Sequence, residues 1–226
     1  MKKHDELIAT LLGDAQASQE LERWLDTDEG RHELAAYRQA LGELTRLYGE
    51  DRIGRPRRPV YYCSLPTPIG RVLVGATDAG LVRVSFRQSE PSFVAELRER
   101  LGADPVRSAA KTADIVRQLR AYFAGERRAF DVRLDLSRLT PFHRRVLMAA
   151  AEVPAGQVVS YGEIARRIGQ PHGSRAVGQA LGRNPVPIVI PCHRVVAAGG
   201  RLGGYTGGLG IKRKLLRLEG ARVAAG

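Results

Sequence analysis

The chain has 226 residues, is 43% hydrophobic and carries a net charge of +12, which suits a soluble protein with a buried core and two domains. No run of 18 apolar residues occurs, and the N-terminus reaches charged side chains too early for a signal peptide. We therefore expect a cytoplasmic protein that does not bind membranes. A reducing compartment favours free thiols at the two cysteines, Cys63 and Cys192.

The charge is unevenly distributed along the chain. Residues 1–55 contain 8 Lys and Arg against 12 Asp and Glu, whereas residues 140–226 contain 13 against 3. Such an excess of basic residues is expected of a domain that neutralises the phosphates of a nucleic acid. A solvated, arginine-rich surface gives the same count, so charge alone leaves both interpretations open.

The first 48 residues have apolar side chains at helical spacing, for example Leu21, Trp24 and Leu25, and predict two or three helices. The segment GEDRIGRPRRP (49–59) combines prolines and glycines with charges, which indicates a linker. We therefore expect a helical N-terminal extension over residues 1–55, and its sequence suggests no function.

Three alternating apolar runs follow, VYYCSL, RVLVGAT and LVRVSF, separated by the turn sequences PTPIG and DAG. This pattern predicts an antiparallel meander in which Cys63 is a strand residue. Helical patterns over 91–101 and 109–124, together with a strand-like FDVRLDL, complete a predicted α+β domain.

The last third of the chain contains three predicted helix starts. Thr140 before Pro141 is an N-cap sequence, Ser160 with Glu163 predicts a capping box, and Ser174 is expected to cap a third helix after the break GQPHG. Two short helices across a tight turn predict a helix-turn-helix. In most proteins with this motif the second helix reads DNA in the major groove.

The second helix of this motif carries small side chains. Ala176 and Gly178 leave little beyond the backbone, and Arg175 and Gln179 are the main polar protrusions. A helix this slim fits the minor groove, which is only about 6 Å wide and offers degenerate base readout. Tight packing against a neighbouring helix is the alternative explanation for the same residues.

The stretch VPIVIPCHRVVAA (186–198) places Cys192 next to His193 at the end of a strand-like run. A nucleophilic thiolate needs a base and a positive environment, which His193 and Arg194 can supply, whereas a buried small hydrophobic residue is the plainer interpretation. An imidazole at the next strand position does not face the thiol, so a turn or a bridging water is required. The scattered histidines and two distant cysteines predict no metal site.

Several motifs together resemble those of the O6-alkylguanine-DNA alkyltransferases, or methylated-DNA–protein-cysteine methyltransferases: NPVPIVIPCHRVV, VVSYGEIA, SRAVGQALGRNP, GGYTGGLGIKRKLLRLEG and TPFHRRVL. The resemblance implies an α+β fold, in which a ribonuclease-H-like α/β domain (60–137) precedes a winged-helix-like helix-turn-helix domain (138–222). Residues 1–55 lie outside it. Some members of the family hold a structural zinc ion, but this chain lacks the cysteines for that site.

The resemblance also implies roles for single residues. Cys192 would accept the alkyl group, His193 would take the thiol proton through a water, and Glu219 would orient the imidazole. Tyr161 would turn the target phosphate and assist guanine as the leaving group. The residues implied to bind DNA or the flipped base are Arg175, Ala176, Gly178, Asn184, Pro187, Val195, Tyr205 and Thr206. In this set, Arg175 would fill the gap left in the base stack and Asn184 would act as a hinge.

The implied activity is DNA repair by direct, stoichiometric transfer of an alkyl group from O6-alkylguanine to Cys192, after minor-groove binding and base flipping. O4-alkylthymine is a second candidate substrate. We expect no cofactor and no metal, a monomer, and double-stranded DNA containing O6-alkylguanine as the partner.

Two alternative functions remain. A helix-turn-helix DNA-binding regulator would not transfer alkyl groups and should carry base-reading side chains in place of Ala176 and Gly178; a thiol hydrolase would turn over.

Overall fold

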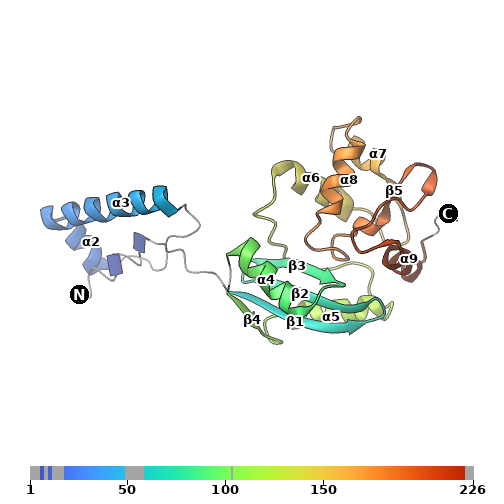
Figure 1. The fold of residues 1–226 in the computed structure, drawn as a ribbon, viewed down its shortest axis with the longest axis horizontal. Helices are drawn as coiled ribbons and strands as arrows, with labels where there is room; N and C mark the ends of the chain where they lie inside the picture. The colour runs from blue at the N-terminus through green and yellow to red at the C-terminus, as the bar shows by residue number, and fades with distance from the viewer. Residues whose placement is uncertain (1–5, 8–9, 12–17, 49–58, 103, 222–226) are drawn as a thin grey trace. The chain divides into compact units, whose positions relative to one another are not determined.

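The computed structural model describes residues 6–7, 10–11, 18–48, 59–102 and 104–221 (Figure 1). The chain forms two compact units, one of residues 1–58 with 102–104 and one of residues 59–101 with 105–226, and each is described by itself. Within the described residues, no helix is both long and apolar enough to cross a lipid bilayer.

The first unit contains the helices α2 (Gln19–Leu25) and α3 (Asp28–Tyr48). Ser18 precedes α2, and its side chain accepts a hydrogen bond from Leu21 N at 3.1 Å, which satisfies one of the free N–H groups at the helix start. The sequence correctly predicted helices here. Apart from Pro59, the predicted linker lies outside the described residues.

The second unit begins with a four-stranded sheet of order β3-β2-β1-β4. Its strands are β1 (Val60–Thr67), β2 (Gly70–Thr77), β3 (Gly80–Phe86) and β4 (Pro105–Arg107). The first three form the predicted antiparallel meander, and Cys63 is a strand residue that pairs with Val74. β4 pairs with β1 in parallel. It was not predicted because three residues are too few for an alternating pattern.

Helices α4 (Glu90–Leu101) and α5 (Ala113–Phe123) lie on opposite faces of the sheet (Figure 1). Phe93 of α4 contacts the ring of Tyr62, with 6.3 Å between ring centroids. Cys63, the next residue of β1, points to the other face, where it lines a cavity with Val116 of α5. Both helices agree with the predicted segments apart from a few terminal residues.

The prediction that FDVRLDL (130–136) forms a strand is wrong. Leu134 forms only a single bridge, with Leu81. A shift in the register between β2 and β3 at this point makes the edge of β3 irregular, so the pairing does not continue. Further along β3, Val84 N donates instead to Pro185 O at 2.8 Å. The edge of β3 is therefore shared by two segments of the chain.

The rest of the chain packs as helices around a two-stranded parallel sheet. The helices are α6 (Pro141–Ala151), α7 (Tyr161–Arg167), α8 (Ser174–Gly182) and α9 (Leu209–Leu218), and the strands are β5 (Val159–Ser160) and β6 (Val195–Val196). α7 and α8 pack against each other and against α6, and they form the predicted helix-turn-helix (Figure 1). The fold is α+β, as predicted.

Two of the three predicted helix starts in this region are confirmed at their caps. Thr140 accepts a hydrogen bond from His143 N at 3.3 Å, and Pro141 occupies the first turn of α6. Ser160 accepts a hydrogen bond from Glu163 N at 3.0 Å at the start of α7. These caps fix where α6 and α7 begin.

Two details of these starts differ from the prediction. The Glu163 carboxylate pairs with Arg166 and Arg167 one turn later in α7, and no bond returns it to Ser160, so only half of the capping box forms. Ser174 is the first residue of α8 and not its cap. Gly173 holds the cap position and offers no side chain to bind the helix N–H groups.

Candidate active site

Cys192 lies in a short 3-10 turn, η1 (Cys192–Arg194), and not at the end of a strand. The preceding run is not extended, because Ile188 has a left-handed backbone with φ +77° and Pro187 forms a bridge with Ile190 inside the run itself. The strand-like interpretation of this segment is therefore wrong. A turn, one of the two possibilities considered from the sequence, sets the directions of the Cys192 and His193 side chains.

Asn184 attaches this segment to the end of α8. Its side chain is buried, Nδ2 donates to Ile190 O at 2.8 Å, and Oδ1 accepts from Val186 N at 3.0 Å. The amide thus pairs with main-chain groups of a run that forms no regular ladder. Cys192 N in turn donates to Ile190 O at 2.8 Å, so Asn184 and Cys192 share one carbonyl.

The Cys192 thiol is buried, with 8% of the residue exposed. Burial raises its pKa above the ordinary value, and a hydrogen bond with Asn184 and the charge of Lys212 offset only part of this effect. The thiol is therefore protonated at neutral pH. It needs a base before it can act as a nucleophile.

His193 and Glu219 form a buried pair, with imidazole Nε2 3.0 Å from carboxylate Oε1. Burial alone raises the pKa of Glu219, but hydrogen bonds and charges from His193 and Arg194 outweigh it and lower the pKa to about 2. An ionised carboxylate only accepts hydrogen bonds, so Nε2 carries a proton. Burial lowers the pKa of His193, so the ring stays neutral and Nδ1 keeps its lone pair. Nδ1 is buried and has no hydrogen-bond partner among the described residues. The pair therefore presents a neutral imidazole base.

Two further residues bind Glu219. Arg194 was expected only to supply positive charge near Cys192, and Tyr122 was not expected at the site at all. Arg194 donates from Nε to Oε2 at 2.9 Å and from Nη2 to Oε1 at 2.8 Å. Tyr122 of α5 donates to Oε1 at 2.8 Å. Arg194 is marked by its place in the Cys-His-Arg motif, whereas no local pattern marks Tyr122. The carboxylate at the end of α9 is thus held by residues from distant parts of the chain.

Lys212 of α9 is a buried cation that was not among the predicted site residues. Its Nζ donates to the carbonyls of Val195 at 2.6 Å, Leu202, and Gly204 at 3.5 Å. Burial lowers the pKa of Lys212 to about 8, and the charge of a Cys192 thiolate opposes this shift. The ammonium shapes the loop before α9 and favours the charged form of Cys192.

Tyr161, the first residue of α7, packs between α8 and the loop before α9. Its hydroxyl donates to Gly204 O at 3.2 Å. Gly203 lies against the ring with φ +62°, and a Cβ there would be 3.1 Å from the ring, so this position requires glycine. Gly178 of α8 faces the same ring at ordinary contact distance. Burial raises the pKa of the Tyr161 hydroxyl, which therefore stays protonated at neutral pH.

A cavity of about 260 Å³ lies beside Cys192. The predicted site residues that line it are Asn184, Pro187, Tyr205 and Thr206. The cavity also has lining residues that were not predicted, and five of them belong to β3 and its end: Arg83, Val84, Ser85, Phe86 and Arg87. The wall of the cavity is thus built partly from the sheet.

The other predicted binding residues lie outside this lining. Val195 is buried in β6, and its carbonyl binds Lys212. Arg175 and Ala176 are exposed in the first turn of α8, where they are open to a partner. The structure therefore separates the predicted residues into a group around Cys192 and a group on the surface of α8.

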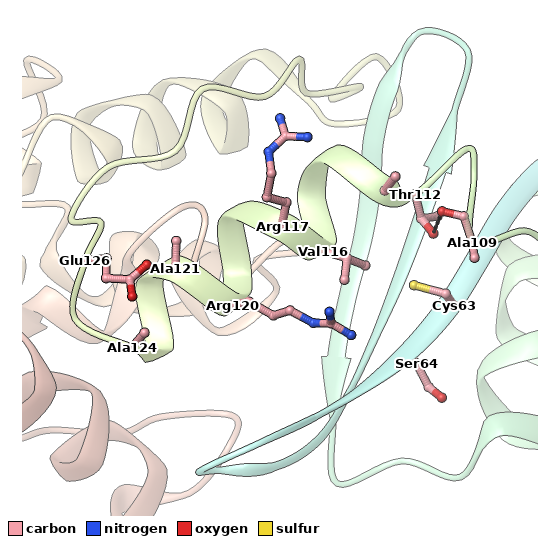
Figure 2. Close-up of a pocket in the computed structure, with 11 residues that line it drawn as sticks. Cys63, Ser64, Ala109, Thr112, Val116, Arg117, Arg120, Ala121, Ala124 and Glu126 are labelled. Carbon is pink, nitrogen blue, oxygen red and sulfur yellow. Dashed lines mark hydrogen bonds between the residues drawn. The ribbon is translucent and has the colours of Figure 1, made fainter.

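A second cavity, of about 630 Å³, lies between β1 and α5 (Figure 2). Figure 2 shows Cys63 pointing toward it, with Val116 and Arg120 of α5 on the opposite side. It shares no lining residue with the cavity beside Cys192. Both cysteines are free, and burial raises the pKa of the Cys63 thiol.

The described residues contain no group of three or more His, Cys, Asp and Glu placed to hold a metal ion.

Two family models match the second unit. Residues 60–136 match the ribonuclease-like domain of 6-O-methylguanine DNA methyltransferase, and residues 141–221 match its DNA-binding domain. The chain belongs to the methylated-DNA–protein-cysteine methyltransferase family. The resemblance inferred from the sequence is confirmed, and residues 1–59 lie outside both matches.

Individual relatives agree with this assignment. The methylated-DNA–protein-cysteine methyltransferase of Methanosarcina acetivorans is 43% identical over 162 residues, which cover 72% of this chain and 99% of the relative. The enzyme of the same name from Mycobacterium tuberculosis is 43% identical over 166 residues, which cover 74% of this chain and 96% of the relative. The crystal structure of the Mycobacterium tuberculosis protein OGT in complex with DNA superimposes with a TM-score of 0.62 at 41% identity and covers 71% of this chain and 93% of its own.

Proposed function

We propose that this member of the family repairs DNA by moving the alkyl group of O6-alkylguanine directly onto Cys192, once per protein molecule. The observation that carries the proposal is a buried thiol at a small cavity, followed in one turn by a histidine whose partner is an ionised glutamate. The names of the relatives and the DNA in one of their crystal structures support it.

The reaction begins with loss of the thiol proton. His193 Nδ1 takes this proton through a bridging water, and the carboxylate of Glu219 stabilises the resulting imidazolium. The thiolate then attacks the alkyl carbon, an S–C bond forms, and the C–O6 bond breaks with its electron pair going to guanine. Lys212 lowers the free energy of the thiolate before the attack.

Tyr161 assists the leaving group. Guanine departs as an anion that holds the electron pair of the broken C–O6 bond. It takes a proton from the Tyr161 hydroxyl, which gives unmodified guanine, and Tyr161 then regains a proton from solvent. The protein keeps a thioether at Cys192. No group at the site hydrolyses a thioether, so the transfer is stoichiometric.

Recognition of DNA is assigned to α8. Arg175 and Ala176 are exposed there on a helix with few bulky side chains, which suits entry into the minor groove of double-stranded DNA. Arg175 fills the gap that the flipped nucleotide leaves in the base stack. Asn184, Pro187, Tyr205, Thr206 and Val195 shape the site that receives the base. The protein acts as a monomer in the cytoplasm.

The test is to mix the protein with a duplex containing one O6-methylguanine and to weigh the intact protein. The intact mass should rise by about 14 Da, from replacement of the thiol hydrogen by methyl. After digestion, this gain should lie on the peptide that contains Cys192. A helix-turn-helix regulator binds the duplex without a gain in mass, and a thiol hydrolase releases the methyl group with turnover. Either of these results would overturn the proposal.

A further inference from the structure

Phe86, at the end of β3, lines the cavity beside Cys192 although it belongs to the ribonuclease-like domain. Its ring stacks on the ring of Tyr205, with 6.2 Å between centroids and 16° between planes. The loop before α9 is therefore backed by an aromatic side chain of the other domain. Neither the sequence motifs nor the proposed reaction assigns Phe86 a role.

The contact extends to Gly207, two residues after Tyr205. A Cβ at position 207 would lie 2.1 Å from Phe86 Cε2 and 2.9 Å from Tyr205 Cε1. Phe86 thus fills the space that any side chain at 207 would occupy. The loop cannot move toward β3 without displacing this ring.

Two neighbouring contacts fix the position of Phe86. Val84 lies two residues earlier, on the same side of β3, and its N donates to Pro185 O at 2.8 Å. Arg87 follows with φ +65°, an unfavourable backbone for a residue other than glycine, and its guanidinium donates to Gly207 O at 3.3 Å. Hydrogen bonds therefore hold the end of β3 on both sides of Phe86. The bond from Val84 joins it to the segment that leads to Cys192, and the bond from Arg87 joins it to the loop before α9.

We propose that Phe86 is a specificity-determining residue that limits the size of the alkyl group Cys192 can accept; this rests on the proposed function. The reacting carbon must reach the thiolate, so the remaining atoms of a larger alkyl group project into the cavity. That cavity, about 260 Å³, is smaller than the roughly 300–1,000 Å³ pockets of drug-sized ligands. Because Phe86 supports Tyr205 and Gly207 from behind, the cavity cannot widen on this side, and methyl is favoured over bulky groups.

The test compares single-turnover transfer from duplexes that carry O6-methylguanine or O6-benzylguanine at the same position. Phe86→Ala should raise the ratio of the benzyl rate to the methyl rate by about tenfold, the scale of discrimination that a hydrophobic pocket achieves. Tyr62→Ala is the matched control, because this aromatic of the same sheet packs on Phe93 and does not line the cavity. Its ratio should equal that of the wild type.

A second pair of variants tests the contact itself. Gly207→Ala should slow both transfers in the wild-type background, because the new methyl group meets Phe86, and should cost much less in the Phe86→Ala background. An unchanged ratio in folded Phe86→Ala, or equal costs of Gly207→Ala in both backgrounds, would overturn the inference. If Phe86→Ala does not fold, Phe86→Leu replaces it under the same criterion. A wild-type protein that transfers no methyl refutes the proposed function instead.

Discussion

The Tyr122 hydroxyl donates a hydrogen bond to Glu219 Oε1 at 2.8 Å, which places a residue of the ribonuclease-like domain in contact with the acid that holds His193. Both groups are buried. Removal of this bond should weaken the fold and the site together, because a carboxylate in a buried position depends on each of its donors.

Tyr122→Phe should therefore lower the free energy of unfolding by about 1.5–3 kcal/mol, the usual range for a hydrogen bond to a charged group. The rate of alkyl transfer should fall less than in Glu219→Gln, since His193 and Arg194 still bind the carboxylate. Urea denaturation and single-turnover kinetics measure the two effects. Tyr62→Phe removes a hydroxyl from β1 and serves as the control, with neither quantity changed. Full stability in Tyr122→Phe would contradict the prediction.

Glu219→Gln should slow alkyl transfer and raise the apparent pKa of the Cys192 thiol. The imidazolium of His193 loses its anionic partner, so proton transfer from the thiol becomes less favourable. Part of the rate should return at alkaline pH, where solvent removes the thiol proton. The measurement is single-turnover transfer from O6-benzylguanine across pH, with circular dichroism to confirm folding.

His193→Ala should act in the same direction with a larger loss. The double variant should lose much less than the sum of the two single losses, because residues that act as a unit are not additive. Strictly additive losses, or a folded Glu219→Gln protein without recovery at high pH, would show that Glu219 only caps the end of α9.

Glu219 should also make the stability of the protein depend on pH. Its pKa is lowered in the folded state from 4.5 to about 2, so its contribution is complete above pH 4.5 and is lost as the pH falls toward 2. A shift of this size corresponds to about 3 kcal/mol. The difference in unfolding free energy between wild type and Glu219→Gln should therefore shrink from about pH 6 to about pH 3. A difference that stays constant over this range would be evidence against the low pKa.

Cys192→Ser should abolish alkyl transfer and leave DNA binding intact, because in the proposed mechanism affinity comes mainly from contacts with phosphates and from insertion of α8. Cys63→Ser should retain full transfer, since Cys63 faces a separate cavity between β1 and α5. Intact mass and gel-shift measurements give both readouts. Methyl found on Cys63 in the Cys192→Ser protein would refute the assignment of the acceptor.

Arg175→Ala should slow repair of duplex DNA more than reaction with the free base O6-benzylguanine. Extrusion of a nucleotide costs a few kcal/mol, and in the proposed mechanism the Arg175 side chain offsets part of this cost, whereas the free base needs no extrusion. The two rate constants, measured at one salt concentration, give the comparison. Equal losses on both substrates would assign Arg175 to a different step.

Local patterns predicted the parts of the fold that depend on neighbouring residues. The meander follows from alternating runs and turn residues, and the starts of α6 and α7 follow from Thr140 and Ser160. The strand expected at 130–136 failed because its partner edge on β3 is irregular and binds Pro185 further along. A pattern within one segment cannot show whether the neighbouring strand has a regular edge with free hydrogen-bonding groups.

The candidate site divides in the same way. The Cys-His-Arg motif and the resemblance together indicated Cys192, His193 and Glu219, and the structure places the last two in contact. Tyr122 and Phe86 were not predicted as site residues, because each reaches the site through tertiary packing from the other domain. The strand-like interpretation of the segment before Cys192 failed because apolar β-branched residues are equally compatible with a buried irregular run.

The hydrogen bond from Val84 to Pro185 and that from Tyr122 to Glu219 both cross from residues 60–136 to residues 141–221. The two matched regions are therefore poor units for recombination, although each resembles a separate module. A chimera that takes one region from this chain and the other from a relative should repair DNA only when both members of each crossing pair remain compatible. Libraries of shuffled alkyltransferases should be designed with Phe86 and the loop of Tyr205 inherited together.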